Sequence, residues 1–400
     1  MALPKTIIPI FLHTFSYKYP LPSNPFLREP FSPFPKHSKK KKQKKKSQKM
    51  EPQPELELTE LIPGLPEEIA LECLTRLHYD THAVASDVCR RWRHLLQDRS
   101  FYYHRKKSGL TRRTACFVQA LPVEPEPGRS EAKPEKQPKY GLSVFDPATN
   151  NWDQIDPVPK YPNGLPLFCQ VASTEGKLVV MGGWNPVNWE PLRDVFVYEF
   201  TTRRWTQRVD MPSTRSFFAA GACDGKVYVA GGHDESKNAL RSAWVYNIAL
   251  DEWTELTRMS EERDECEGVM IGSEFWVVSG YDTDSQGRFK DDAEVLDIVA
   301  GTWRRVEGVW GESRCPRSCV AVGQNGNFIS WGAYEPEVQV GTCGVDLGDC
   351  VLVTGSVYQS APLAVYVVEK TNQGQNGKST KIDIPNEFSG FVQSGCLVEI

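Results

Sequence analysis

Three stretches of the chain repeat one arrangement of residues, with a period of about 49 residues. In each stretch a short apolar run ends in glycine, an alternating run follows, and a tryptophan closes the unit. The glycines are Gly183, Gly232 and Gly280, and the tryptophans are Trp205, Trp253 and Trp303. A period of this size is typical of propeller blades, because one small sheet cannot bury both of its faces and must pack against neighbours. The repeat predicts a mainly β protein folded as a propeller.

These residues resemble the kelch repeat, in which a double glycine precedes a Tyr and a Trp at fixed distances. The first two stretches match at Gly182, Gly183, Tyr198 and Trp205, and at Gly231, Gly232, Tyr246 and Trp253. The resemblance implies a kelch β-propeller, which we place at residues 112–400. Residues 318–332 and 351–384 keep parts of the pattern. We therefore predict six blades, with five as the alternative.

The two ends of the predicted propeller are expected to pair. Residues 390–400 form one more strand pattern and have no place in a sixth blade. We predict that this strand is the innermost one of the first blade, beside residues 116–121, because closure of the ring removes an exposed edge. Residues 122–138, rich in Pro, Glu and Lys, are predicted to interrupt that blade as a disordered insertion.

The first 50 residues differ in charge from the rest of the chain. They contain twelve Lys and Arg and one Glu, a net charge of +11, which leaves −15 for the remainder of a chain at −4. Residues 1–60 are predicted to be a disordered basic tail. The lysine run at 39–46 fits a nuclear localisation signal or a polyanion patch, or a solvated tail with no role in the fold, which we prefer. Translation from Met1 or from Met50 stays open.

Residues 61–108 have a helical pattern. A Leu-Pro pair opens an amphipathic helix with acids in its first turn, and a second helix is predicted over residues 83–97. The Leu-Pro opening and a later Val-Cys-x-x-Trp signature resemble an F-box. The resemblance implies docking onto a Skp-type adaptor and a cullin-based ubiquitin ligase. The residues assigned to adaptor binding are Leu65, Pro66, Ile69, Leu74, Val88, Cys89 and Trp92. In the alternative, these residues only form the core of a small helical bundle, which would be marginally stable alone.

Composition argues against several other classes. No apolar run approaches the roughly 18 residues that a membrane span needs, so we expect a soluble protein of the cytoplasm or nucleus. The eleven cysteines lack a Cys-x-x-Cys spacing and are expected to be reduced and mostly buried, without zinc. A surface position is expected for His78, His82, His94 and His104. A copper radical oxidase needs several converging His and Tyr ligands, but His233 is the only histidine after His104. No nucleophile–base pair is evident, so no cofactor, metal site or catalysis is expected.

A protein substrate is expected on one face of the propeller. There the loop between the second and third strands of a blade lies near the loop that enters the next blade. Aromatic, Arg and carboxylate side chains in these loops are typical of a protein interface. The residues assigned to substrate binding are Trp184, Asn185, Arg215, Phe217, His233, Asp234, Arg263, Asp264 and Tyr281. In the alternative, the Arg and Asp side chains brace the blades.

The combination of an F-box with kelch repeats resembles a plant family of ubiquitin-ligase substrate receptors. The motifs that begin at Arg215, Gly231 and Arg263 are most similar to members that direct phenylalanine ammonia-lyase to degradation and so reduce phenylpropanoid synthesis. Related receptors act on cytokinin response regulators, which is the alternative substrate class. The other alternative is a kelch scaffold without a ligase role. Binding of nucleic acid is not expected, because the body of the chain is acidic.

Overall fold

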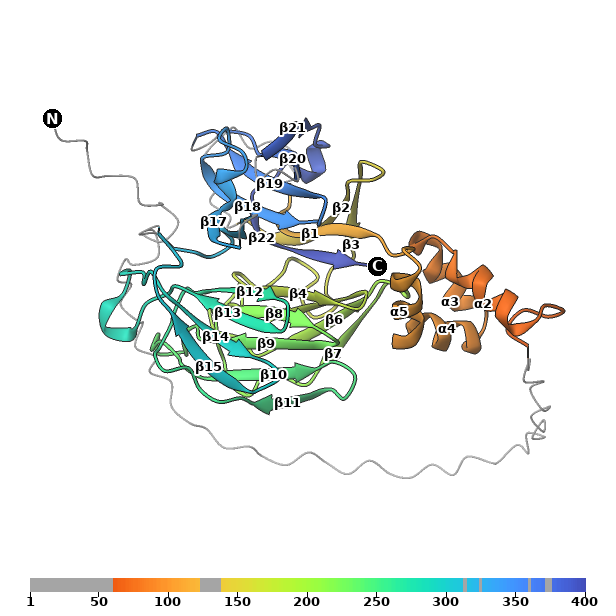
Figure 1. The fold of residues 1–400 in the computed structure, drawn as a ribbon, viewed down its shortest axis with the longest axis horizontal. Coiled ribbons are helices and arrows are strands. Elements are labelled where there is room, and N and C mark those ends of the chain that lie inside the picture. The colour runs from red at the N-terminus through yellow and green to blue at the C-terminus, as the bar shows by residue number, and fades with distance from the viewer. Residues whose placement is uncertain (1–59, 123–137, 312–314, 324–325, 359–360, 371–375) are drawn as a thin grey trace, which may run out of the picture. The chain divides into compact units, whose positions relative to one another are not determined.

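The computed structural model describes residues 60–122, 138–311, 315–323, 326–358, 361–370 and 376–400. The basic tail and nearly all of the predicted insertion lie outside these residues. In the described part, helices are followed by six antiparallel sheets, five of four strands and one of two. Figure 1 shows the labelled strands in chain order around the propeller. None of the helices within the described ranges is both long and apolar enough to cross a membrane.

The first four sheets are complete blades. The first contains β22 Val392–Glu399, β1 Arg113–Ala120, β2 Tyr140–Asp146 and β3 Asn151–Ile155. The second contains β4 Gln170–Thr174, β5 Lys177–Met181, β6 Val195–Glu199 and β7 Arg204–Arg208. The third contains β8 Ala219–Cys223, β9 Lys226–Ala230, β10 Ala243–Asn247 and β11 Glu252–Glu255. The fourth contains β12 Glu267–Ile271, β13 Glu274–Val278, β14 Ala293–Asp297 and β15 Thr302–Val306.

The last two sheets are where the sequence pattern was weakest. The fifth has only β16 Val320–Val322 and β17 Phe328–Ser330 among its described residues. The sixth contains β18 Val340–Asp346, β19 Cys350–Ser356, β20 Ala364–Lys370 and β21 Asn376–Ile382. Over the residues that the structure describes, the propeller thus has five complete blades and one two-stranded sheet. The apolar pattern of the sequence did not predict β18, because this strand contains two glycines. At least one of them is required by close packing, since a Cβ at Gly344 would lie 2.4 Å from the Trp331 ring.

The ring closes as predicted. Strand β22 pairs antiparallel with β1, from Glu399 opposite Arg113 to Val392 opposite Gln119. The order β22-β1-β2-β3 puts β22 on the inner side of the first blade. The pairing confirms the predicted contact between the C-terminal strand and the first strand, and β1 has a partner on both sides.

Tryptophans in the fourth strands connect neighbouring blades. The indole N–H groups of Trp205, Trp253 and Trp303 donate to the backbone carbonyls of Asp156, Val209 and Thr257, at 2.7, 3.2 and 2.7 Å. Each acceptor lies one or two residues after the outermost strand of the preceding blade, which is β3, β7 or β11. The repeated tryptophan therefore fixes one blade against the next, which explains its regular spacing.

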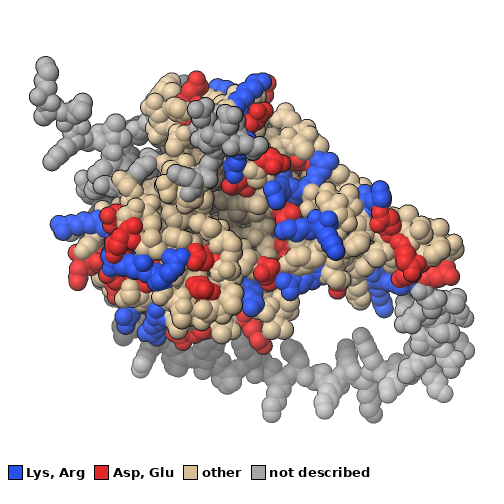
Figure 2. Space-filling model, in the orientation of Figure 1, with Lys and Arg blue, Asp and Glu red and all other residues tan. Residues whose placement is uncertain are grey.

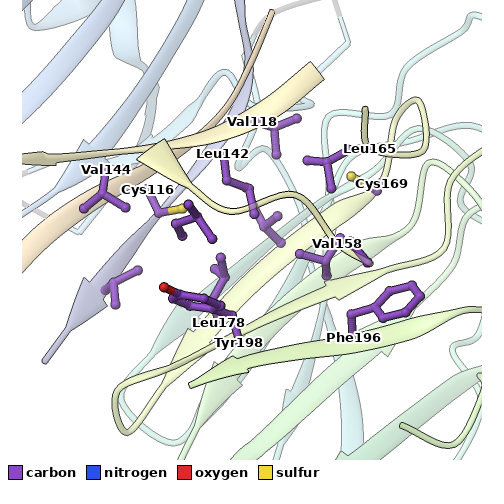
Figure 3. Packing of buried hydrophobic residues seen from close by; sticks show 14 of the residues in the cluster. Cys116, Val118, Leu142, Val144, Val158, Leu165, Cys169, Leu178, Phe196 and Tyr198 are labelled. Atoms are coloured by element: carbon purple, nitrogen blue, oxygen red, sulfur yellow. The ribbon is translucent and has the colours of Figure 1, made fainter. Parts of the chain in front are cut away.

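The glycines after the second strands are required by their close surroundings. Gly232 has a φ of +79°, and a Cβ there would lie 2.4 Å from the carbonyl oxygen of Ser216. Any side chain would clash with the loop that enters the same blade. Apolar side chains fill the space between blades, and Figure 3 shows one such cluster between the first two blades, with Leu142, Val144, Leu178 and Phe196.

The helices precede the propeller. They are α2 Glu67–Thr75, α3 His82–Val88, α4 Arg90–Gln97 and α5 Arg99–Lys107. Pro66 and two acids begin α2 as the sequence indicates. The single helix predicted over residues 83–97 is wrong, because Cys89 is extended, at φ −156° and ψ 166°, and separates α3 from α4. Its sulfur accepts a hydrogen bond from the Trp92 N–H at 3.4 Å and so caps α4.

The expected surface position of His82 is also wrong. Its side chain is fully buried, and its ring centroid lies 6.4 Å from that of Phe101. Burial, followed by the positive charge of Arg105, lowers the pKa of His82 to about 4. His82 is therefore neutral in the folded helices at physiological pH.

The stability of the helices should fall in mild acid. The unfolded chain takes up a proton at His82 near its ordinary pKa of about 6.5, whereas the folded chain does not until about pH 4. Between these values the unfolded state binds more protons, so the free energy of unfolding should drop by about 2 kcal/mol from pH 7.5 to pH 5. Hydrogen exchange of the α2–α5 amides measures this change. His82→Leu should remove most of it, and an unchanged pH dependence in that variant would contradict the assignment.

Candidate interaction surfaces

The helical region exposes apolar side chains on α2 and α3. Ile69 is 52% exposed, Val84 73% and Val88 60%. Val84 and Val88 are four residues apart and lie on one side of α3. Exposed aliphatic side chains at this density on a small helical unit are typical of a surface that a partner covers. Val84 was not among the assigned residues, although its spacing from Val88 would have identified it.

The other assigned residues divide between surface and core. Pro66 is exposed, and Leu65, Cys89 and Trp92 are half-buried. Leu74 is buried and packs with Ala70, Leu96 and Phe101. The Trp92 indole donates to the Leu61 carbonyl at 2.7 Å, which ties α4 to the segment before α2. Leu74 therefore supports the helices from inside, while Pro66, Ile69 and Val88 remain accessible.

Helix α5 joins this unit to the propeller. Arg99 Nε donates to Glu175 Oε1 at 2.7 Å, and the Tyr103 hydroxyl donates to the same oxygen at 2.9 Å and to Asp224 at 3.1 Å. Lys106 Nζ and Thr111 Oγ1 donate to the two carboxylate oxygens of Glu399, at 2.7 and 2.9 Å. Glu175 and Asp224 follow β4 and β8, and Glu399 ends β22. The helices thus attach at the ends of the inner strands.

The opposite end of these strands carries the loops assigned to substrate binding, and we refer to it as the loop face. Isolated bridges connect the loop entering a blade with the loop after its second strand, at Leu167 with Trp184, Ser216 with His233, and Asp264 with Tyr281. The structure therefore brings the assigned residues of three blades to one face, away from the contacts of α5.

The two assigned arginines are not accessible on this face. Arg215 is 1% exposed and Arg263 is fully buried. Arg215 donates to the Gly231 and Ser242 carbonyls at 3.1 and 3.3 Å. Arg263 Nη1 donates to the Ser279 carbonyl at 2.9 Å and to Asp292 Oδ1 at 2.8 Å. Both side chains brace the blades, which was the alternative interpretation, so we do not keep them as contact residues.

Both buried arginines are charged, as the pKa values of Arg215 and of Asp292, the partner of Arg263, indicate. Burial lowers the pKa of Arg215 to about 10, so it stays protonated at neutral pH. Burial opposes ionisation of Asp292, yet the hydrogen bond and charge of Arg263 lower its pKa below the ordinary value. The Arg263–Asp292 contact is therefore an ion pair within the fourth blade.

A chain of hydrogen bonds crosses the loop face. The Trp184 indole donates to Ser216 Oγ, which lies 3.2 Å from His233 Nε2. His233 Nδ1 lies 2.9 Å from both oxygens of Asp264. Because Ser216 Oγ accepts from the indole, its own hydrogen can be donated to Nε2, and Nδ1 then donates to the carboxylate. The Phe217 ring stacks on His233, with centroids 5.3 Å apart.

These hydrogen bonds join Ser216, His233 and Asp264 in a Ser–His–Asp arrangement, which the sequence did not indicate. Ser216 is fully buried, and its oxygen is occupied by the indole. A nucleophile must reach the substrate carbon, and Ser216 cannot. The arrangement instead links loops of the second, third and fourth blades. His233 and Asp264 are 6% and 4% exposed, so they support this surface from beneath.

Within the loops assigned to substrate binding, the exposed large apolar side chains lie in the β5–β6 loop. Val187 is 87% exposed and Trp189 38%, and Asn185 is half-buried with its side-chain oxygen on the Val187 N–H at 2.9 Å. This loop borders a pocket of about 470 Å³ that is lined also by Tyr161 and Pro162. Val187 and Trp189 were not assigned, although both lie within the loop that the sequence singled out.

Towards the third and fourth blades the face is aromatic and charged. Phe217 is half-buried, and the Arg317 guanidinium lies 4.3 Å from its ring centroid. Tyr281, 8% exposed, donates to Glu265 at 3.1 Å, and burial raises the pKa of Glu265. Asp234 accepts from the Ser236 and Asn238 N–H groups, both at 2.9 Å, and shapes its own loop.

The distribution of charged and metal-ligating side chains can be described for the residues that the structure covers. Figure 2 shows acidic and basic side chains interspersed over the visible face, without a broad basic patch. Within the described residues, no cluster of three or more His, Cys, Asp or Glu side chains is arranged to hold a metal ion. All eleven cysteines are free, and four of them are buried, fewer than expected.

Comparison with known proteins agrees with both units. An F-box domain model matches residues 62–104, and a KLHDC2/KLHL20/DRC7 Kelch-repeats domain model matches residues 128–330. F-box/kelch-repeat protein At2g44130 of Arabidopsis thaliana is 43% identical over 63% of this chain and 66% of its own length. F-box/kelch-repeat protein SKIP20 is 39% identical over 63% of this chain and 67% of its own length, from the same plant.

A third Arabidopsis thaliana relative, F-box/kelch-repeat protein At1g15670, is 34% identical over 85% of this chain and its whole length. Proteins that combine these two domains are non-catalytic. From its two matched domains and the full coverage of this relative, the chain belongs to the plant F-box/kelch-repeat proteins.

Proposed function

We propose that this protein is the substrate-recognition subunit of a Skp–cullin–F-box ubiquitin ligase of the cytoplasm or nucleus. The observation that carries the proposal is the separation of two accessible surfaces on one connected unit. The α2–α3 side chains Ile69, Val84 and Val88 would bind the adaptor. The loop face would bind the substrate, and α5 holds the two in a fixed relation through Glu175 and Glu399. Ubiquitin transfer is then accelerated by proximity, while other subunits perform the chemistry.

The proposed substrate is phenylalanine ammonia-lyase, whose degradation would reduce phenylpropanoid synthesis. The support is the resemblance of the Arg215, Gly231 and Arg263 motifs to receptors of that enzyme. These motifs brace the blades, so they support a shared scaffold more directly than a shared contact surface. The contacts themselves would come from the accessible loop residues Asn185, Val187, Trp189 and Phe217, with Trp184 and Asp234.

Substrate binding should depend on the β5–β6 loop. Val187→Asp combined with Trp189→Ala should weaken binding of purified phenylalanine ammonia-lyase by at least about tenfold, because exposed apolar anchors dominate such interfaces. Biolayer interferometry with the full chain measures the affinity.

Two further results interpret that experiment. Leu250→Asp, at a 65% exposed position in the β10–β11 turn, should bind like the unaltered chain. If phenylalanine ammonia-lyase does not bind the unaltered chain, the substrate proposal fails while the receptor proposal remains testable through the adaptor. If phenylalanine ammonia-lyase binds the unaltered chain, the Val187 and Trp189 double variant and Leu250→Asp equally, the loop face is not the binding surface.

A further inference from the structure

Two cysteines face each other across the strand pair that closes the propeller. Cys116 of β1 and Cys396 of β22 are direct partners in the antiparallel register. At the end of this ladder Arg112 and Ile400 exchange both backbone hydrogen bonds, each with an N–O distance of 2.8 Å. Hydrogen-bonded and non-hydrogen-bonded pairs alternate along such a ladder. With the register unbroken up to Val118, Cys116 and Cys396 form a hydrogen-bonded pair.

This position places the two side chains within reach of each other. The Cα atoms of a hydrogen-bonded pair are about 5.5 Å apart, within the range of roughly 4.4–6.8 Å that disulfides bridge. Directly opposed residues also point to the same side of a sheet. The packing agrees, because Cys116 and Cys396 contact the cluster between the first two blades. Their neighbours Phe117 and Leu397 contact the cluster on the other side.

Other cysteines are less suitable partners. Cys343 packs in the cluster on the far side of this sheet, with Phe117. Cys169 shares the cluster with Cys116, but it precedes β4, and Figure 3 shows the two at separate places in it. The thiol of Cys116 is hydrogen-bonded to Cys396, and this contact, followed by burial, raises the pKa of Cys116 well above its ordinary value. The register therefore places the two thiols next to each other on one side of the sheet.

We propose that Cys116 and Cys396 form a reversible disulfide when a peroxide-class oxidant is present, and that this bond locks the propeller ring. Cys396 is partly exposed, whereas Cys116 is buried, so Cys396 reacts first. Its thiolate sulfur attacks one peroxide oxygen, the O–O bond breaks, and a sulfenic acid and hydroxide form. The Cys116 sulfur then attacks the Cys396 sulfur and releases its proton, while the S–O bond breaks and hydroxide leaves. Two thiols lose two electrons and two protons, and one peroxide becomes two waters.

The bond would act at the point where the two units of the protein meet. Strand β1 follows α5 directly, and Glu399 of β22 accepts hydrogen bonds from Lys106 and Thr111. Opening of the ring at its closing strand pair separates β1 from β22. A covalent link between positions 116 and 396 prevents that separation and constrains a very long loop of the unfolded chain. Oxidation should therefore slow unfolding of the ring, and a dithiol reductant should reverse the effect.

Peptide mapping of the full chain tests the proposal. After treatment with hydrogen peroxide and blocking of free thiols, non-reduced digests should contain a peptide that links Cys116 to Cys396. Unfolding in urea should become at least about tenfold slower, and dithiothreitol should restore the original rate. Cys169→Ala should show the same cross-link and the same slowing as the unaltered chain.

The variant Cys396→Ala should show neither effect. Mapping of the unaltered chain needs no variant and remains decisive if that one fails to fold. Cys396 found as a sulfinic acid with Cys116 still a free thiol would overturn the proposal. So would a cross-link from Cys396 to Cys343.

Discussion

Replacing Ile69 and Val88 together by aspartate will weaken binding of a Skp-type adaptor by at least about 100-fold. Both side chains are more than half exposed, so the helices should fold with the new residues. Each aliphatic side chain that a partner buries contributes about 1.5–3 kcal/mol, and the carboxylates add a desolvation cost. A loss of about 1.4 kcal/mol is tenfold in affinity. Isothermal titration calorimetry with purified adaptor measures the change.

The matched control is Val187→Asp, which adds a carboxylate at an 87% exposed aliphatic position on the loop face. It should leave the adaptor affinity within about twofold, since fully exposed substitutions away from an interface have small effects. The Ile69 and Val88 variant should in turn still bind substrate. Equal adaptor affinity in all three proteins would show that α2 and α3 do not form the adaptor surface.

The second large effect is expected at Arg263. Replacing this fully buried side chain by methionine removes the cation that contacts Glu294 in the interior of the fourth blade, and leaves Asp292 with its contact to the half-exposed Arg305. Removal of one member of a buried ion pair costs about 3–5 kcal/mol, because the remaining charge is uncompensated. Urea denaturation of the full chain should show this decrease in the free energy of unfolding.

Arg258→Met provides the comparison. Arg258 is 61% exposed in its side chain and contacts Glu255 at 3.4 Å, so its loss should cost less than about 1 kcal/mol. If Arg263→Met left stability unchanged and abolished substrate binding, Arg263 would be a contact residue after all. If Arg263→Met lowered stability and substrate binding together, Arg263 would act by holding the fourth blade in shape through its hydrogen bonds.

Much of the fold could be predicted because the repeat is enforced by local geometry. Gly232 is confined by the Ser216 carbonyl, and Trp253 must reach the Val209 carbonyl. These requirements recur in the second, third and fourth blades, so they leave a period in the sequence. The pairing of β22 with β1 was predictable because an unpaired edge has few other solutions in a closed ring.

Other features depend on partners that are distant in sequence. The sequence does not distinguish an arginine that contacts a substrate from one that donates to a backbone carbonyl. Only the structure shows that Arg215 and Arg263 donate to the carbonyls of Gly231 and Ser279. His82 has no sequence signal for burial, since its contact Phe101 lies on another helix. Strand β18 was missed because close packing on Trp331 requires glycine where the pattern expects an apolar side chain.

Assembly of the full chain with a Skp-type adaptor and a cullin is the central property to measure. Equimolar purified proteins would be mixed at micromolar concentration and separated by size-exclusion chromatography with mass detection. We expect one complex that contains one copy of each protein, and no such complex when Ile69 and Val88 are replaced by aspartate. Elution of the folded chain alone, with the adaptor and cullin in a separate peak, would contradict the assignment of a ubiquitin-ligase subunit.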